Sequence, residues 1–212
     1  MPFTNFHFVP APLAVLALLG AGFATAVVLA VAAIFALAGR ASLARKLFLC
    51  GAALPAAYAV LLLALGAAQR ERTVPAGSEK YFCEVDCHVA NAVQSTREEA
   101  GAGGRRIVVS LRTRFDETTI SPQRGNSPLT PNPRRAELVD RRGRRYPAEP
   151  AGLASLATPL RPGESYVTDL VFGVPPDARD LRLSLVESDW PTRLLLGHEN
   201  GPPRGETLFA LR

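Results

Sequence analysis

Two long uncharged runs constrain this chain more than any other feature of its sequence. Residues 11–39 and residues 47–68 contain no Asp, Glu, Lys or Arg. An α-helix needs roughly 20 apolar residues to cross a bilayer, and both runs reach that length. A cleaved signal peptide has a basic start and a shorter apolar core, whereas residues 1–10 lack Lys and Arg. We therefore expect two transmembrane helices, 11–39 and 47–68, and an anchor that is not cleaved.

The charges next to the two runs predict how the hairpin is oriented. The connecting loop 40–46 carries Arg40, Arg45 and Lys46, and short cytoplasmic loops are enriched in such residues. We therefore expect a two-pass protein of the inner (cytoplasmic) membrane, with this loop in the cytoplasm and the hairpin in the lipid bilayer. The interfacial N-terminus, residues 1–10, and everything after the second helix would then be extracytoplasmic.

The composition changes after the second run. All 19 acidic residues follow position 70, and residues 69–79 form a polar linker with Pro and Gly. The remaining residues, 80–212, are numerous enough for one domain with its own core. Sequence alone therefore predicts an anchor followed by a single extracytoplasmic domain.

Apolar and polar residues alternate along several segments of this domain, which is typical of half-buried β-strands. Clear examples are IVVSLRTRF and ESYVTDLVFGV, and segments rich in Pro, Gly and Asp separate such runs. The pattern predicts an all-β antiparallel sandwich. Pro and Asn are frequent in 117–133, which we expect to be a long ordered loop. The predicted strands are 81–93, 107–115, 136–140, 164–174, 180–186, 192–197 and 206–211.

One segment also carries a family resemblance. PLRPGESYVTDLVFGVPPDARDLRLSLVE, residues 159–187, resembles the closing half of bacterial immunoglobulin-like (telokin-like) extracytoplasmic domains. In that family a Pro-Gly turn precedes a strand that ends Val-Phe-x-Val-Pro, and another apolar strand follows. The chain as a whole resembles bacterial membrane-anchored proteins that carry such a domain. The resemblance implies an immunoglobulin-like fold and an extracytoplasmic location, and it supplies no catalytic residues.

Residues 82–89, FCEVDCHV, look like a cofactor motif. Covalent haem attachment requires Cys-x-x-Cys-His, and here the two cysteines are separated by one residue too many. Two spans followed by an external β-domain with Cys-x3-Cys resemble the copper-carrying subunit of respiratory oxidases. That family continues with His and Met where this chain has Asn91 and Gln94. We therefore expect no cofactor at this motif.

Three interpretations of the two cysteines remain. Four residues of extended strand span about 13 Å, and Cα atoms more than about 7 Å apart cannot be bridged. A local disulfide, which an oxidising compartment favours, therefore needs a turn or bulge at 84–86. A straight strand instead leaves two separate buried thiols. The third interpretation, less favoured, is a Cu(I) site, because thiolates and imidazole suit copper; its ligands would be Cys83, Cys87, His88 and His198.

Arginine is concentrated in the 134–145 segment. Guanidinium groups bind phosphate bidentately, so this segment is a candidate contact for lipid headgroups or a polyanionic envelope partner. A solvated basic turn is the simpler interpretation. Nucleic acid is not expected, because the domain is extracytoplasmic and Tyr146 is the one aromatic residue nearby. The candidate residues are Arg134, Arg135, Arg141, Arg142, Arg144 and Arg145.

No motif in the sequence indicates an enzyme. Ser188, Asp189 and His198 have the residue types of a catalytic triad, but the Gly-x-Ser-x-Gly elbow that would activate the serine is absent. We expect a non-catalytic module that binds or scaffolds an envelope protein or polyanion, through the 117–133 loop and the arginine segment. The alternative is a periplasmic copper-binding or thiol-redox protein that uses its Cys-x3-Cys pair.

Overall fold

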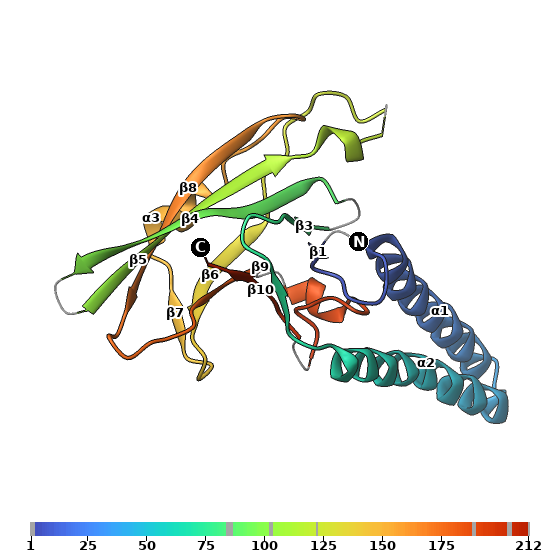
Figure 1. Ribbon diagram of the computed structural model, residues 1–212. Coiled ribbons are helices and arrows are strands. Elements are labelled where there is room, and N and C mark those ends of the chain that lie inside the picture. The colour runs from blue at the N-terminus through green and yellow to red at the C-terminus, as the bar shows by residue number, and fades with distance from the viewer. Residues whose placement is uncertain are drawn as a thin grey trace. The chain divides into compact units, whose positions relative to one another are not determined.

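The chain forms two compact units in the computed structural model, which describes residues 3–83, 87–101, 104–121, 123–187, 190–202 and 205–211 (Figure 1). The helical unit consists of Phe6–Gln69 and Pro191–Arg204. The second unit, here called the β domain, consists of Met1–Asn5, Arg70–Trp190 and Gly205–Arg212. The β domain thus includes residues from both sides of the helices in the sequence.

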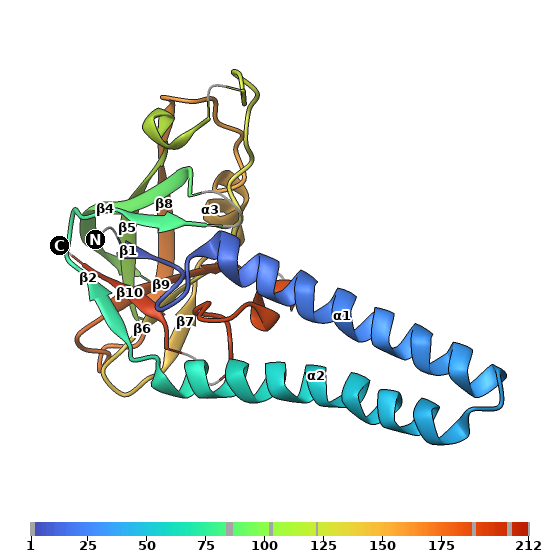
Figure 2. The same ribbon diagram turned by 90° about the vertical axis from the view of Figure 1, so that its right-hand side faces the viewer.

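The helical unit is built on a hairpin of two long helices, α1 (Ala11–Leu37) and α2 (Ala41–Ala68) (Figure 2). Both are long and apolar enough to cross a membrane. The second helix begins at Ala41, so Arg45 and Lys46 lie in its first two turns. Large apolar side chains on both helices are exposed, for example Phe23. A surface of this kind suits hydrocarbon better than water.

The strand predicted at 192–197 is wrong. These residues form the end of a 3-10 helix, η2 (Trp190–Leu194), and the turn that follows it. The hydroxyl of Tyr58 on α2 donates a hydrogen bond to the last carbonyl of η2, at 2.8 Å. Leu195 and Leu196 are both buried, which a half-buried strand would not allow for adjacent residues.

The β domain contains two mixed sheets. The strand order is β1-β3-β4-β5-β8 in the first sheet and β2-β10-β9-β6-β7 in the second. The strands are β1 Phe3–Thr4, β2 Arg72–Val74, β3 Lys80–Phe82, β4 Val89–Gly101, β5 Gly104–Phe115, β6 Pro133–Val139, β7 Arg145–Pro147, β8 Ser165–Val174, β9 Arg182–Glu187 and β10 Thr207–Ala210. Two short helices complete the domain, η1 (Glu117–Thr119) and α3 (Pro150–Ser155).

The prediction of a purely antiparallel domain is wrong, because two pairs are parallel: β1 with β3, and β2 with β10. Both extra strands come from segments that the sequence analysis assigned to an interfacial N-terminus and a polar linker. The first precedes α1 and the second follows α2. Neither is long enough to show a period, so alternation could not reveal them.

One apolar core lies between the sheets. Val109 and Leu111 of β5 pack in the same buried cluster as Leu138 and Leu183 of the second sheet. These residues occupy alternate positions along their strands, as the period-two pattern predicts. The strands predicted at 107–115, 136–140, 164–174, 180–186 and 206–211 are confirmed as β5, β6, β8, β9 and β10.

The continuous strand predicted at 81–93 is wrong. The segment is a hairpin in which β3 ends at Phe82, β4 begins at Val89, and these two residues lie opposite each other. The core-facing residues are even-numbered in β3, Lys80 and Phe82, and odd-numbered in β4, Val89 and Asn91, so the period-two pattern changes phase between the two strands. A single strand over 81–93 would place Tyr81 on the buried face, whereas Tyr81 is only partly buried.

A polar row crosses the buried face of the first sheet. Lys80, Asn91 and Thr113 lie opposite one another in adjacent strands, and all three are completely buried. The hydroxyl of Thr113 donates to Oδ1 of Asn91 at 2.8 Å. Burying a polar group costs free energy unless the group is hydrogen-bonded, so the side chains of this row need hydrogen-bonding partners.

Lys80 finds its partners in the opposite sheet. Its Nζ donates to the carbonyls of Leu185 at 3.3 Å and Thr207 at 3.2 Å. The same atom lies 4.7 Å from the ring centre of Phe82 and 5.8 Å from that of Phe209. Lys80 therefore connects the two sheets through the core.

Candidate functional site

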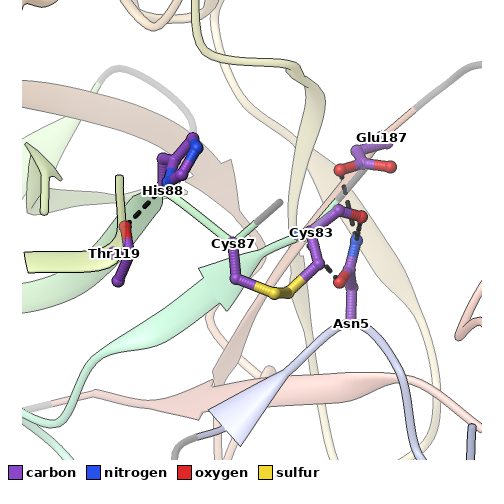
Figure 3. Close-up of a disulfide and its surroundings, with 6 residues drawn as sticks. All are labelled: Asn5, Cys83, Cys87, His88, Thr119 and Glu187. Carbon is purple, nitrogen blue, oxygen red and sulfur yellow. Dashed lines mark hydrogen bonds between the residues drawn. A yellow bond between two sulfur atoms is a disulfide. The ribbon is translucent and has the colours of Figure 1, made fainter. Parts of the chain in front are cut away.

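A disulfide closes the β3–β4 hairpin. Cys83 and Cys87 are bonded, and their Cα atoms are 4.1 Å apart (Figure 3). This separation excludes the extended strand with two separate thiols, and it confirms the local disulfide. Residues 84–86, where the sequence analysis expected a turn or bulge, lie outside the described residues.

The N-terminal segment holds this disulfide in place. The side-chain amide of Asn5 donates to the carbonyl of Cys83 at 3.1 Å and to Oε1 of Glu187 at 3.2 Å, and its Oδ1 accepts from the amide of Cys83 at 3.0 Å (Figure 3). Asn5 is completely buried and Glu187 is 3% exposed. The expectation that residues 1–10 form only an interfacial tail is therefore wrong for Asn5. Its side chain is part of the β domain.

A cleft of about 440 Å³ lies beside the disulfide. Phe82 and His88, the residues flanking the two cysteines, line one wall. The 117–133 loop supplies much of the rest, and Glu187 also reaches the surface of the cleft. Volumes of this size are typical of small-molecule sites. The remaining lining residues are Val89, Ser121, Gln123, Arg124, Leu129, Thr130, Pro131 and Asn132.

Phe115 supports two nitrogen-bearing side chains of the cleft. The ring of His88 stacks on it with centroids 5.6 Å apart, and the guanidinium of Arg124 lies 4.8 Å from its ring centre. Nδ1 of His88 is also hydrogen-bonded to the hydroxyl of Thr119 at 2.7 Å (Figure 3). The stacking fixes the direction of both side chains, which is the pre-organisation that a binding site needs.

Arg124 differs from most arginines of the β domain. Its guanidinium donates to the carbonyl of Ser127 at 2.6 Å, and it pairs with no carboxylate among the described residues. The side chain is half-buried at the edge of the cleft. Arg124 is therefore a cation that a ligand anion can approach.

A charged cluster anchors the start of the same loop. The Tyr81 hydroxyl donates to Asp116 at 2.6 Å, and Arg114 bridges Asp116 and Glu79. The hydrogen bond from Tyr81 holds the pKa of Asp116 well below its usual range. Burial and the bond to Asp116 raise the pKa of Tyr81 to about 12. The amide of Asp116 donates to the carbonyl of His88 at 2.8 Å, which connects the cluster to the cleft wall.

Reduction of the disulfide tests how firmly it holds this wall. We expect the free energy of unfolding of the β domain to fall by about 2 kcal/mol, the chain-entropy value for a loop this short. Thiol counting on the SDS-denatured chain should give one reactive thiol, Cys50, before reduction and three after it. Three reactive thiols before reduction would contradict the disulfide.

The arginine segment is largely occupied by internal ion pairs. Arg144 pairs with Asp140 at 2.7 Å and with Asp177 at 3.0 Å. Desolvation of the carboxyl opposes the shift, but the hydrogen bonds to Arg144 and to backbone amides lower the pKa of Asp140 to about 2. Arg135, Arg142 and Arg145 also have carboxylate partners within 3.8 Å. Arg141 is exposed and has no such partner among the described residues, and the side chain of Arg134 lies outside the described part of the structure.

The four candidate copper ligands do not form one site in this structure. The two cysteines are in a disulfide and so carry no thiolate. His198 belongs to the helical unit, where its Nδ1 accepts a hydrogen bond from the amide of Asn200 at 3.0 Å. No cluster of three His, Cys, Asp or Glu side chains that could hold a metal is found among the described residues. Ser188 and Asp189 lie outside those residues.

Comparison with known proteins adds little to this geometry. No family model and no curated protein matches the chain. A solved structure that is similar to it is the 1.5 Å crystal structure of MPT63, a secreted protein from Mycobacterium tuberculosis. The sequences are 11% identical, the match covers 66% of this chain and 97% of MPT63, and the TM-score is 0.42.

Sequence reasoning missed the residues that shape the cleft. Asn5 lies 78 positions from Cys83, and no local pattern connects the two. Glu187 ends a strand whose alternation does not distinguish a buried carboxylate from an exposed one. The 117–133 loop was predicted to be an interaction surface, but its position beside the disulfide hairpin required the fold.

Proposed function

We propose that the chain is a bacterial, membrane-anchored, extracytoplasmic binding module that takes a small ligand in the cleft beside its disulfide. The observation that carries this proposal is the cleft itself, which is lined by the 117–133 loop and by the β3–β4 hairpin that the disulfide closes. The immunoglobulin-like classification of the domain is part of the proposal and rests on the 159–187 segment. The module is non-catalytic in this account, since the cleft residues fit recognition.

The order of elements supports an uncleaved two-span anchor in the inner membrane. β1 and Asn5 precede α1, while β2 follows α2, and all of them belong to the β domain. Both ends of the hairpin must then lie on one side of the membrane, as two antiparallel spans require. The basic turn at the other end favours the cytoplasm for that end. Cleavage after α1 would remove Asn5 from the domain.

The groups in the cleft favour a ligand with an anionic end and an apolar body. Arg124 supplies a fixed cation, and Gln123 and Asn132 supply amide donors close to it in the sequence. Phe82 and Leu129 supply apolar surface. A small number of polar groups that orient a largely apolar ligand is typical of small-molecule sites.

A series of linear carboxylates from acetate to octanoate tests the proposal on the full chain in lipid nanodiscs. We expect affinity, measured from thermal stabilisation, to increase with chain length, and Arg124→Gln to weaken binding about 10-fold, as loss of a charge-assisted hydrogen bond does. Thr130→Trp, at an exposed lining position, should block binding. Arg141→Gln is the matched control and should bind as the unaltered protein does. Equal binding by all variants would contradict the cleft as the site.

A thiol-redox function is the second candidate, because Cys87 is partly exposed in its disulfide. A catalytic or regulatory disulfide should equilibrate with a glutathione buffer, whereas a structural one should stay oxidised. Copper binding by the reduced pair belongs to the same alternative. We expect the disulfide to resist glutathione, and ready reduction would favour this second function.

A further inference from the structure

An open groove of about 480 Å³ lies between α1 and α2 near the turn that connects them. Its lining is apolar except for Arg45. The α1 contributions, Leu29, Ala32, Ala33 and Ala36, repeat at the spacing of one helix face. The α2 contributions are Ala44, Arg45 and Phe48.

Side-chain size explains why the groove is there. Gly51 lies so close to α1 that a Cβ at this position would come within 2.8 Å of Cδ2 of Leu29. Small residues permit close helix packing in membranes. Toward the connecting turn the facing residues are alanines, but the bulkier Phe48 and Arg45 border them, and space remains between the helices. In a bilayer such a space is filled by lipid.

The basic residues at the turn determine which class of lipid headgroup suits the groove. The first 70 residues contain no Asp or Glu, and Arg40, Arg45 and Lys46 all lie at the turn. Arg45 is exposed at the groove, where its guanidinium can pair bidentately with a phosphate. Basic pockets between transmembrane helices are known to select anionic headgroups. A zwitterionic lipid offers the same phosphate but neutralises it with its own cation.

We propose that this groove is a binding site for one anionic phospholipid, with an acyl chain along the alanine face and its phosphate on Arg45. The occupant is a bilayer lipid and not a soluble phosphate, because the lining apart from Arg45 is hydrocarbon. The site requires the hairpin to lie in a bilayer, but it does not depend on the ligand cleft or on the orientation of the protein.

Native mass spectrometry of the full chain tests the site. The protein is equilibrated with equal amounts of dioleoyl phosphatidylglycerol and dioleoyl phosphatidylcholine, and retained lipid is counted. We expect a preference of ~5-fold for phosphatidylglycerol, the size expected of one arginine near an anionic surface. Arg45→Gln should abolish the preference. Ala36→Leu, which fills the groove, should reduce retention of both lipids.

Two control variants separate this site from general effects. Arg40→Gln removes the same charge from the turn without touching the groove, and Ala30→Leu adds the same bulk at an exposed position outside it. Both should retain lipid as the unaltered protein does. Loss of the preference in Arg40→Gln, equal to that in Arg45→Gln, would show diffuse attraction and overturn the proposal. So would unchanged retention in both groove variants.

Discussion

Replacing Asn5 by alanine is expected to lower the free energy of unfolding of the β domain by about 3–5 kcal/mol, although residue 5 lies before the first helix. The variant removes three hydrogen bonds in a completely buried place. It leaves the amide and carbonyl of Cys83 and one oxygen of Glu187 without the Asn5 partner. Buried groups that lose a partner cost more than the bond itself contributed.

Urea unfolding of the detergent-solubilised chain measures this effect, with Trp190, the single tryptophan, as the fluorescent reporter. Asn126→Ala is the matched control, since Asn126 is exposed in the 117–133 loop, and its effect should be below about 0.5 kcal/mol. A fragment of residues 70–212 should fold poorly, and attaching residues 1–9 through a flexible linker should restore folding. Equal stability of the two asparagine variants would contradict the role of Asn5.

The second large effect is expected at Lys80. Lys80→Met keeps the apolar stem and removes Nζ, so the carbonyls of Leu185 and Thr207 lose a donor in the core. Two bonds from a charged donor, less the cost of burying that donor, give an expected loss of about 2–4 kcal/mol. The same urea experiment measures the loss.

Arg141→Met is the control for this prediction, because Arg141 is an exposed cation without a carboxylate partner among the described residues. Its effect should stay within about 0.5 kcal/mol. If Lys80→Met were as stable as the control, the connection between the two sheets through Nζ would carry no net stability.

The sequence predicted those parts of the fold that depend on local pattern. Two uncharged runs indicated the hairpin helices, and alternation in 107–115 and 164–174 indicated long strands of the first sheet. The pairing of β1 with β3 was not predictable, since two residues carry no period. The burial of Lys80 was not predictable either, because this residue lies at the boundary between an apparent linker and the domain.

The sequence predicted single segments of the candidate site but not how they are arranged. Cys83 and Cys87 were recognised as a possible disulfide, and the 117–133 loop as an interaction surface. Their meeting in one cleft depends on the register of β3 against β4 and on the long-range bonds of Asn5. Such contacts join residues far apart in the chain, so no window of sequence contains them.

We propose that the segment before α1 remains part of the mature protein and that the two helices hold this protein in the membrane. The intact mass of the protein extracted from the membranes of the cells that produce it shows whether the segment is retained. We predict a mass that includes the residues before α1, with one disulfide. A mature chain that begins after α1 would contradict the account, because the β domain would then lack β1 and Asn5.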